Sequence, residues 1–261
     1  MARLSKFIDT SKCTACRGCQ TACKAWNEKK PEIVEFKGFL QTHEDTTPDT
    51  LTIVKMHEEF NGNYQHEWFF RKHQCVHCTE AACVKVCPEG ALSHTETGSV
   101  SIDREKCIGC GYCAQYCPFK VPKINQEEKK MHKCTQCADR VANGLKPACV
   151  KTCSPGAIMF GDREEMISAA KARLEVVKKE YPEANLYGLD FLGGTNTFYL
   201  LLKKPEYYGL PANPTVPTAA IIWKDVISPV GKVLPVAAIS AIAVSAAWIR
   251  LKGNNPEKGG H

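Results

Sequence analysis

The chain has 261 residues, of which 44% are hydrophobic and 24% are charged, and its formal net charge is +6. This length suffices for one or two compact domains with a hydrophobic core. The positive charges are dispersed and form no basic stripe interleaved with aromatic residues, so we expect no nucleic-acid partner. The sequence contains sixteen cysteines, and their regularly repeated C-x2-C pairs favour shared metal ligands over eight separate disulfides.

A short strand is expected at residues 7–9, leading into a first cysteine quartet. The seven N-terminal residues contain neither an apolar signal segment nor twin arginines, so the sequence predicts no signal peptide. The first quartet has C-x2-C-x2-C-x3-C spacing and consists of Cys13, Cys16, Cys19 and Cys23. Residues 24–74 follow as a polar insertion with two predicted strands, at 51–56 and 67–71.

Two further quartets follow each other within residues 75–118, and each ends in a Cys-Pro pair. They are Cys75, Cys78, Cys83 and Cys87, then Cys107, Cys110, Cys113 and Cys117. In two-cluster bacterial ferredoxins with such spacing, the fourth cysteine of each run ligates the cluster held by the other run. We therefore expect an inner module with one 4Fe–4S cluster on Cys75, Cys78, Cys83 and Cys117, and another on Cys107, Cys110, Cys113 and Cys87. A hairpin is expected between them, with strands at 92–94 and 99–102.

The fourth quartet is Cys134, Cys137, Cys149 and Cys153, and two internal repeats predict its partner. Ile8-Asp9-x2-Lys12-Cys13 recurs at residues 102–107, so the first quartet matches the third. Residues 83–92 recur at 149–158, so the second quartet matches the fourth. The first and fourth quartets should then form an equivalent module, closed across the chain. One cluster would be bound by Cys13, Cys16, Cys19 and Cys153, and the other by Cys134, Cys137, Cys149 and Cys23.

Structural zinc is the alternative use of these thiolates, but zinc sites usually combine two C-x2-C halves without a fourth cysteine before proline. Four oxidised 4Fe–4S cubes with their thiolates would add about −8 to the formal charge and bring the protein close to neutrality. A basic residue precedes each quartet: Lys12, Lys72, Lys106 and Lys133. Such cations favour a reduced cluster if they lie close to it, and are otherwise ordinary solvated side chains.

The region after the quartets is expected to cover them. Residues 162–180 are predicted to form an amphipathic helix with Asp162 as N-cap, and residues 197–202 a strand. Together, residues 160–204 would complete a cluster domain of residues 1–204. A proline-rich linker is expected at residues 205–225.

A transmembrane helix is predicted at residues 226–250, because residues 233–249 carry no charge, and a tail follows at 251–261. An alanine-rich helix buried against a partner is the alternative. The flanking charges favour a cytoplasmic C-terminus, with membrane lipid as a partner and the cluster domain in the periplasm. The predicted fold class is therefore α+β, with two ferredoxin-like modules and one C-terminal membrane helix.

No nucleophile or acid–base constellation accompanies the cysteines, so the sequence predicts an electron carrier and not a catalyst. Several features together resemble the beta subunit of the respiratory formate dehydrogenase-N family, within the four-cluster ferredoxin-like subunits of molybdopterin oxidoreductases. They are the four quartets, the Phe7-Ile8-Asp9 start, Trp26-Asn27, Tyr208-Gly209-Leu210-Pro211 and the apolar C-terminal segment. One departure is visible, because Ser154-Pro155 follows Cys153 where the family commonly has proline directly after the cysteine.

This resemblance implies two protein partners. One is a molybdenum- or tungsten-pterin subunit that oxidises formate, and the other is a membrane cytochrome b that passes electrons to quinone. The chain would relay electrons between them through four 4Fe–4S clusters, with the module of the first and fourth quartets facing the catalytic subunit. Three alternatives stay open: the iron–sulfur wire of another membrane oxidoreductase, such as a hydrogenase or a sulfur-compound reductase; a free-standing polyferredoxin; and a zinc-binding interaction protein.

Overall fold

The structure is a computed structural model. It describes residues 3–36, 38, 41, 43–60, 66–222, 240, 242–248 and 250. The chain divides into two units, Met1–Pro217 and Thr218–His261, and each is described by itself.

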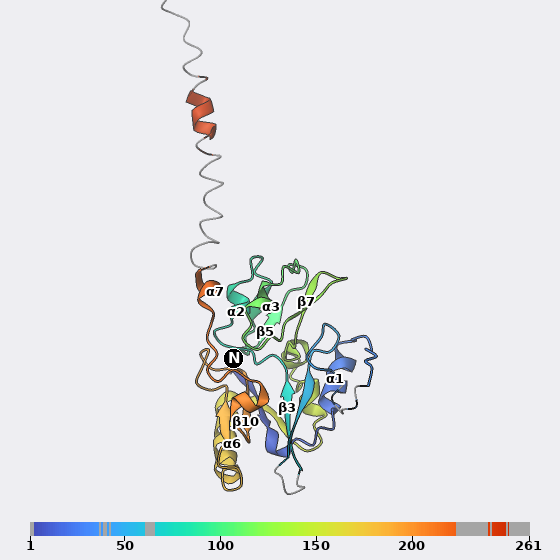
Figure 1. Cartoon of the computed structure of the whole chain (residues 1–261). Helices are drawn as coiled ribbons and strands as arrows, with labels where there is room; N and C mark the ends of the chain where they lie inside the picture. Colours follow the sequence, from blue (N-terminus) through green and yellow to red (C-terminus); the bar gives the residue numbers. More distant parts are fainter. Residues whose placement is uncertain are drawn as a thin grey trace, which may run out of the picture. The chain divides into compact units, whose positions relative to one another are not determined.

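A four-stranded mixed sheet forms one side of the first unit (Figure 1). Its order is β8 (Ile158–Asp162), β1 (Leu4–Asp9), β10 (Thr197–Leu201) and β9 (Asn185–Tyr187). Strand β10 runs parallel to β1, and the two outer pairs are antiparallel. All five side chains of β10 are buried, which is typical of a central strand covered on both faces.

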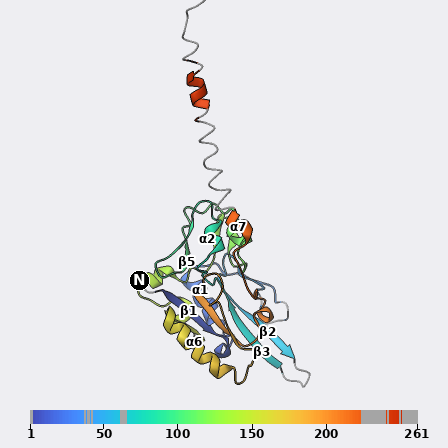
Figure 2. The same ribbon diagram turned by 90° about the vertical axis from the view of Figure 1, so that its left-hand side faces the viewer.

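The largest hydrophobic core lies around this sheet. Phe7 and Phe198 are fully buried and their rings stack with centroids 5.6 Å apart. Helix α6 (Arg163–Val177) runs alongside β1, as Figure 2 shows, and buries Ala170 and Val177 in the core. The Asp162 carboxylate accepts a hydrogen bond from the Glu164 amide at 2.9 Å, so the predicted helix begins at the expected N-cap.

Three antiparallel hairpins complete the strands of this unit. The pairs are β2 (Ile53–Phe60) with β3 (His66–His73), β4 (Leu92–His94) with β5 (Val100–Ile102), and β6 (Lys123–Asn125) with β7 (Lys130–His132). The first two agree with the predicted strands, although β2 and β3 are longer than expected. The hairpin of β6 and β7 was not predicted.

Short helices accompany the cysteine quartets. They are α1 (Gly18–Trp26), α2 (Ala82–Lys85), α3 (Tyr112–Gln115), α4 (Ala138–Ala142) and α5 (Ala148–Lys151). Helices α2 and α5 have the same sequence, Ala-Cys-Val-Lys, as the repeat of the second and fourth quartets requires. Two 3-10 helices follow Asp9 and Lys204, at Thr10–Lys12 and Pro205–Tyr208. Tyr208 is buried, so the start of the predicted linker belongs to the folded core.

The fold is thus a mixture of short helices and small sheets, in agreement with the predicted α+β class. The second unit contains α7 (Thr218–Ile222) and a helical stretch at 242–248. Within the described part of the chain, no helix reaches the length and apolarity that a membrane crossing requires. Most of the predicted transmembrane helix at 226–250 lies outside the described residues. The prediction of a membrane-anchored protein with a periplasmic cluster domain is corrected on this finding.

Candidate metal centres

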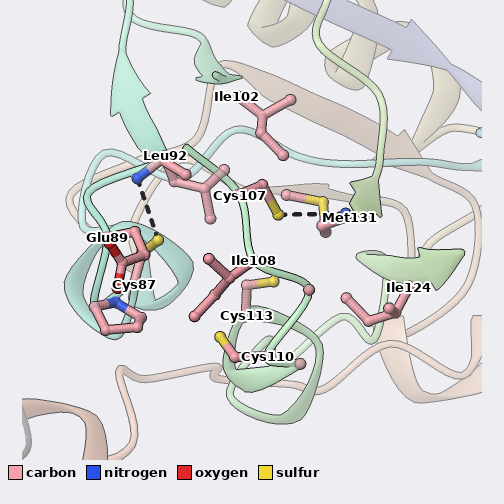
Figure 3. Close-up of a pocket in the computed structure, with 14 residues that line it drawn as sticks. Cys87, Glu89, Leu92, Ile102, Cys107, Ile108, Cys110, Cys113, Ile124 and Met131 are labelled. Atoms are coloured by element: carbon pink, nitrogen blue, oxygen red, sulfur yellow. Dashed lines mark hydrogen bonds between the residues drawn. The ribbon is translucent and has the colours of Figure 1, made fainter. Parts of the chain in front are cut away.

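Three cavities in the first unit are each lined by four cysteines. We name them site A (Cys13, Cys16, Cys19 and Cys153), site C (Cys75, Cys78, Cys83 and Cys117) and site D (Cys87, Cys107, Cys110 and Cys113). Figure 3 shows site D, where Cys107, Cys110 and Cys113 lie across from Cys87. The space at sites A, C and D, including the part open to solvent, is about 390, 380 and 360 Å³, respectively. Such similar sizes suit one kind of group at all three sites.

The remaining four cysteines also come together, and we name them site B: Cys23, Cys134, Cys137 and Cys149. All four are buried. Burial raises the pKa of the Cys23 thiol, Lys72 opposes this rise, and Cys134, Cys149 and Cys137 lie close enough to add to it. The four sites therefore contain the same sets of cysteines that the internal repeats predict. That each set ligates a cluster stays a prediction.

The backbone turns at sites A and D have similar conformations, as the internal repeat predicts. Gly109 and Gly111 in site D have φ values of +69° and +84°, and their counterparts in the first quartet, Ala15 and Arg17, also have positive φ. A side chain at Gly109 is excluded, because its Cβ would lie 2.3 Å from the Lys129 carbonyl oxygen. Backbone N–H groups in turns with left-handed residues can form a concave site that favours an anion.

Backbone amides also donate to several cysteine sulfurs. The Ala91 amide lies 3.3 Å from Cys87 Sγ, the Met131 amide 3.4 Å from Cys107 Sγ, and the Gln136 amide 3.4 Å from Cys134 Sγ. Hydrogen bonds of this kind stabilise a ligating thiolate and help to set the potential of a cluster.

Ser154-Pro155 does not alter the turn after Cys153. The Gly156 amide donates to the Cys153 carbonyl oxygen at 3.1 Å, and the equivalent Gly90 amide donates to Cys87 at 3.4 Å. The departure noted in the sequence therefore leaves the local backbone of site A like that of site D.

Three buried lysines lie against the sites. Lys72 lines site A and Lys133 lines site C. Burial lowers the pKa of Lys6, but Cys149, Cys134 and Cys137 of site B outweigh this effect and raise it above its ordinary value. Each of these lysines is at most 2% exposed. Sequence reasoning missed Lys6, although a lysine next to the apolar pair Phe7-Ile8 in a core strand was a visible signal.

These lysines test whether an iron–sulfur cluster fits. In the described part of the chain, the lysine–carboxylate ion pairs are made by other lysines, namely Lys24, Lys106, Lys123, Lys203 and Lys204. A buried ammonium without a counter-charge is costly, so the three sites need anions at the cysteines. A thiolate-ligated cube carries about −2 and meets this need.

The set of donors at each site can be compared with what a single ion and a cluster require. Among the residues that the structure describes, no group of three or more cysteine, histidine or carboxylate side chains is arranged to hold one metal ion. A zinc site would require four sulfurs at about 2.3 Å from one atom. A 4Fe–4S cube is held by four cysteine thiolates, and this is the donor set that lines each of sites A, C and D.

The histidines and Trp26 have packing roles. His77 is fully buried, and its Nδ1 accepts a hydrogen bond from the Val100 amide at 3.0 Å. His57 packs edge-on against Tyr208. The Arg140 guanidinium lies 4.2 Å from the centroid of the Trp26 ring, which joins α4 to α1.

Cysteines of A and B, of B and C, and of C and D lie close enough to affect one another's pKa values, and we call this order A, B, C, D the row. Burial raises the pKa of Cys19 in site A, and Cys149 of site B is close enough to contribute. Burial raises the pKa of Cys75 in site C to about 11, with a contribution from Cys134 of site B. Cys113 of site D contributes in the same way to the raised pKa of Cys83 in site C.

The two ends of the row are the most exposed, the cysteines of site C are partly exposed, and those of site B are all buried. Cys16 in site A and Cys110 in site D are the exposed cysteines of the molecule, and they occupy equivalent positions in the first and third quartets. The arrangement suits an exchange of electrons with one partner at each end.

Comparisons with known proteins agree with this geometry. Residues 66–163 match the family of 4Fe-4S dicluster domains. The iron–sulfur subunit of the nitrate-inducible formate dehydrogenase of Escherichia coli (strain K12) is 40% identical over 254 residues, which cover 95% of this chain and 84% of that protein. The formate dehydrogenase iron–sulfur subunit of Haemophilus influenzae is 42% identical over 236 residues, covering 88% and 75%. The B component of the anaerobic dimethyl sulfoxide reductase of Escherichia coli is 39% identical over 162 residues, covering 61% and 74%.

Proposed function

Because this protein belongs to the iron–sulfur subunits of formate dehydrogenases, we propose that it relays electrons from a formate-oxidising subunit to a cytochrome b subunit. It is an electron-transfer subunit of a molybdopterin oxidoreductase and carries four 4Fe–4S clusters. In the proposed complex, formate is oxidised at a molybdenum or tungsten pterin in the partner, and this protein performs no catalysis of its own.

The residues proposed to hold the four clusters are the cysteines of sites A to D. When bound, each cluster takes up and releases one electron. The protein holds the sulfurs in place through the short helices α1, α2, α3 and α5, and it excludes water from site B by burying all four cysteines. Amide donors to sulfur and the buried lysines stabilise negative charge at the sites.

The observation that carries this proposal is the row of four cysteine sites with exposed cysteines at its two ends. A storage or structural role would not require an exposed cysteine at both ends and a fully buried site B between them. Next to Cys110, Ile108 is 59% exposed, so the surface at site D offers an apolar contact beside the cluster edge. Such a surface suits the docking of an electron-transfer partner.

The wire of a sulfur-compound reductase is the second candidate. Its support is the similarity to the B component of the dimethyl sulfoxide reductase. The formate dehydrogenase subunits match this chain over a larger share of its length, so formate oxidation is favoured for the partner.

Interruption of the row tests the proposal. In the purified complex, Cys149→Ala removes a ligand from the buried site B and should release about four of about sixteen iron atoms. Formate oxidation with an artificial dye should persist, whereas electron transfer to the cytochrome b should fall about 100-fold, because an interior relay is missing. Val150→Ala, on the same helix α5, is the matched control and should keep iron and both activities.

Two results would contradict the proposal. One is an equal loss of both activities in Cys149→Ala with the complex still assembled. The other is retention of all iron in that variant, which would remove Cys149 from the ligands.

A further inference from the structure

Sites A and D are equivalent in the internal repeat, so their linings can be compared position by position. Ile8 and Ala157 line site A, and their counterparts Ile102 and Ala91 line site D. Two hairpins add matching walls, because Val54 of β2 lines site A and Ile124 of β6 lines site D. The apolar frames of the two sites are therefore alike.

The strand partners of these two wall residues differ in charge. Lys72 pairs with Val54 in the first hairpin, and Met131 pairs with Ile124 in the other. Each stands three positions before the first cysteine of its quartet, Cys75 or Cys134. Lys72 lines site A and Met131 lines site D, so one repeat position supplies an ammonium to one end of the row and a thioether to the other.

Both side chains are inside the protein. Lys72 is 2% exposed and Met131 is 1% exposed. Lys72 Nζ donates to the Thr52 hydroxyl, and the carboxylate ion pairs of the described residues do not include it. In Figure 3, Met131 lies beside Cys107, with Ile124 nearby. The charge of Lys72 therefore acts on site A through a medium with little water to screen it.

Further charges at the two sites act in the same direction but are closer to solvent. Arg17 lines site A, where the counterpart in site D is Gly111. Glu89, which is exposed, lines site D, where the counterpart in site A is Pro155. One cation opposes the trend, since Lys130 Nζ donates to the Cys107 carbonyl oxygen at 2.6 Å. Lys130 is partly exposed, so water screens its charge more than that of Lys72.

We propose that Lys72 and Met131 set the reduction potentials of the two end sites apart, with site A higher and site D lowest in the row. The inference rests on the cluster ligation proposed above. Reduction makes a 4Fe–4S cube more negative, and a nearby buried cation stabilises the more negative state. Lys6 faces site B and Lys133 lines site C. Site D is thus the one site to which the described residues bring no buried lysine, and it gives up its electron most readily.

A redox titration of the purified complex, followed by electron paramagnetic resonance, tests the proposal. The signals of sites A and D are assigned with Cys16→Ser and Cys110→Ser. Lys72→Met should lower the reduction equilibrium constant of site A at least tenfold, which is about 59 mV for a one-electron couple. Met131→Lys should raise that of site D by a similar factor, and the double swap should reverse the order of the two ends.

Lys72→Arg separates charge from packing, because it keeps the cation and should leave the potential of site A near its original value. An equal shift in Lys72→Arg and Lys72→Met would overturn the proposal, as would a wild-type site D with a potential above that of site A. If Met131→Lys does not retain its iron, the Lys72 variants decide alone. Fewer than four 4Fe–4S signals in the wild-type complex would refute the ligation itself, whereas four intact signals with unmoved potentials would refute this inference alone.

Discussion

The two ends of the row are built from one repeat, yet the structure around them is very different. Beside site A, strand β1 is an inner strand of the four-stranded sheet and is packed by α6. Beside site D, the equivalent strand β5 has β4 as its one partner, and the second wall is the short hairpin of β6 and β7. The same cysteine spacing is thus supported by a four-stranded sheet at one end and by two hairpins with three-residue strands at the other.

The difference extends to the cores. The buried cluster around the sheet includes Phe7, Phe198, Tyr199 and Leu200, all essentially inaccessible to solvent. The core at site D has seven buried members, of which two are the cysteines Cys107 and Cys113, whereas the larger core has 22, of which two are Cys19 and Cys149. Small cores bury too little apolar surface to be stable alone and depend on metals or cross-links. The comparison indicates that metal organises the site D half, while a conventional core organises the sheet half.

Removal of iron should give the largest contrast between the halves. After anaerobic chelation, amide protons of β4, β5, β6 and β7 should exchange at least about 100-fold faster, because these hairpins lose the cluster that joins them. Amides of β1 and β10 should remain protected by the sheet and its core. Hydrogen exchange followed by mass spectrometry measures both, and equal loss of protection in the two halves would contradict the comparison.

Two aspartates at equivalent positions of the repeat should show a smaller difference in stability between the two halves. Asp9 ends β1 with a fully buried carboxylate that accepts a hydrogen bond from Arg173 Nε at 3.0 Å. Its repeat counterpart Asp103 is exposed and accepts from the Glu105 amide. Asp9→Ala should lower the free energy of unfolding by about 2 kcal/mol, less than for a fully buried pair because Arg173 is partly exposed.

Asp103→Ala is the control for that pair and should change the unfolding midpoint much less than Asp9→Ala, since water already solvates its carboxylate. Denaturant unfolding of the iron-loaded protein measures both variants. Similar losses would mean that the sheet half does not depend on its buried ion pair.

The helix cap of α6 should give the smallest effect. Asp162→Ala removes the acceptor for the Glu164 amide and should cost about 1 kcal/mol. Asp162→Asn keeps an acceptor and should be nearly neutral. Because α6 packs on the sheet, the loss should appear in thermal unfolding while the spectroscopic signal of site D stays unchanged, and a change in that signal would show that the two halves are coupled.

Sequence spacing predicted the parts of the fold that are local or repeated. The two internal repeats gave the grouping of cysteines that the structure brings together, and the sequence also predicted the hairpin of β4 and β5 and the cap of α6. The pairing of β1 with β10 was not predicted, because its partners Lys6 and Thr197 lie far apart along the sequence and no local pattern records such a contact.

Burial of charge was also beyond the sequence. Lys12, Lys72, Lys106 and Lys133 hold similar places before the four quartets, but Lys12 and Lys106 are exposed whereas Lys72 and Lys133 are buried. Lys6, which acts on three cysteines of site B, belongs to a strand well before any of that site's cysteines. Tertiary packing therefore determines which lysine lies against which cysteine site.

The crossed closure of the chain has a consequence for biosynthesis. The cysteines of sites C and D end at Cys117, whereas sites A and B both wait for cysteines beyond residue 133. As the nascent polypeptide leaves the ribosome, the cysteines of sites C and D are all present first, and the N-terminal thiols stay without their partners until the remainder has been made. Strand β1 waits longer still for β10, so the oldest residues of the polypeptide are among the last to find their place.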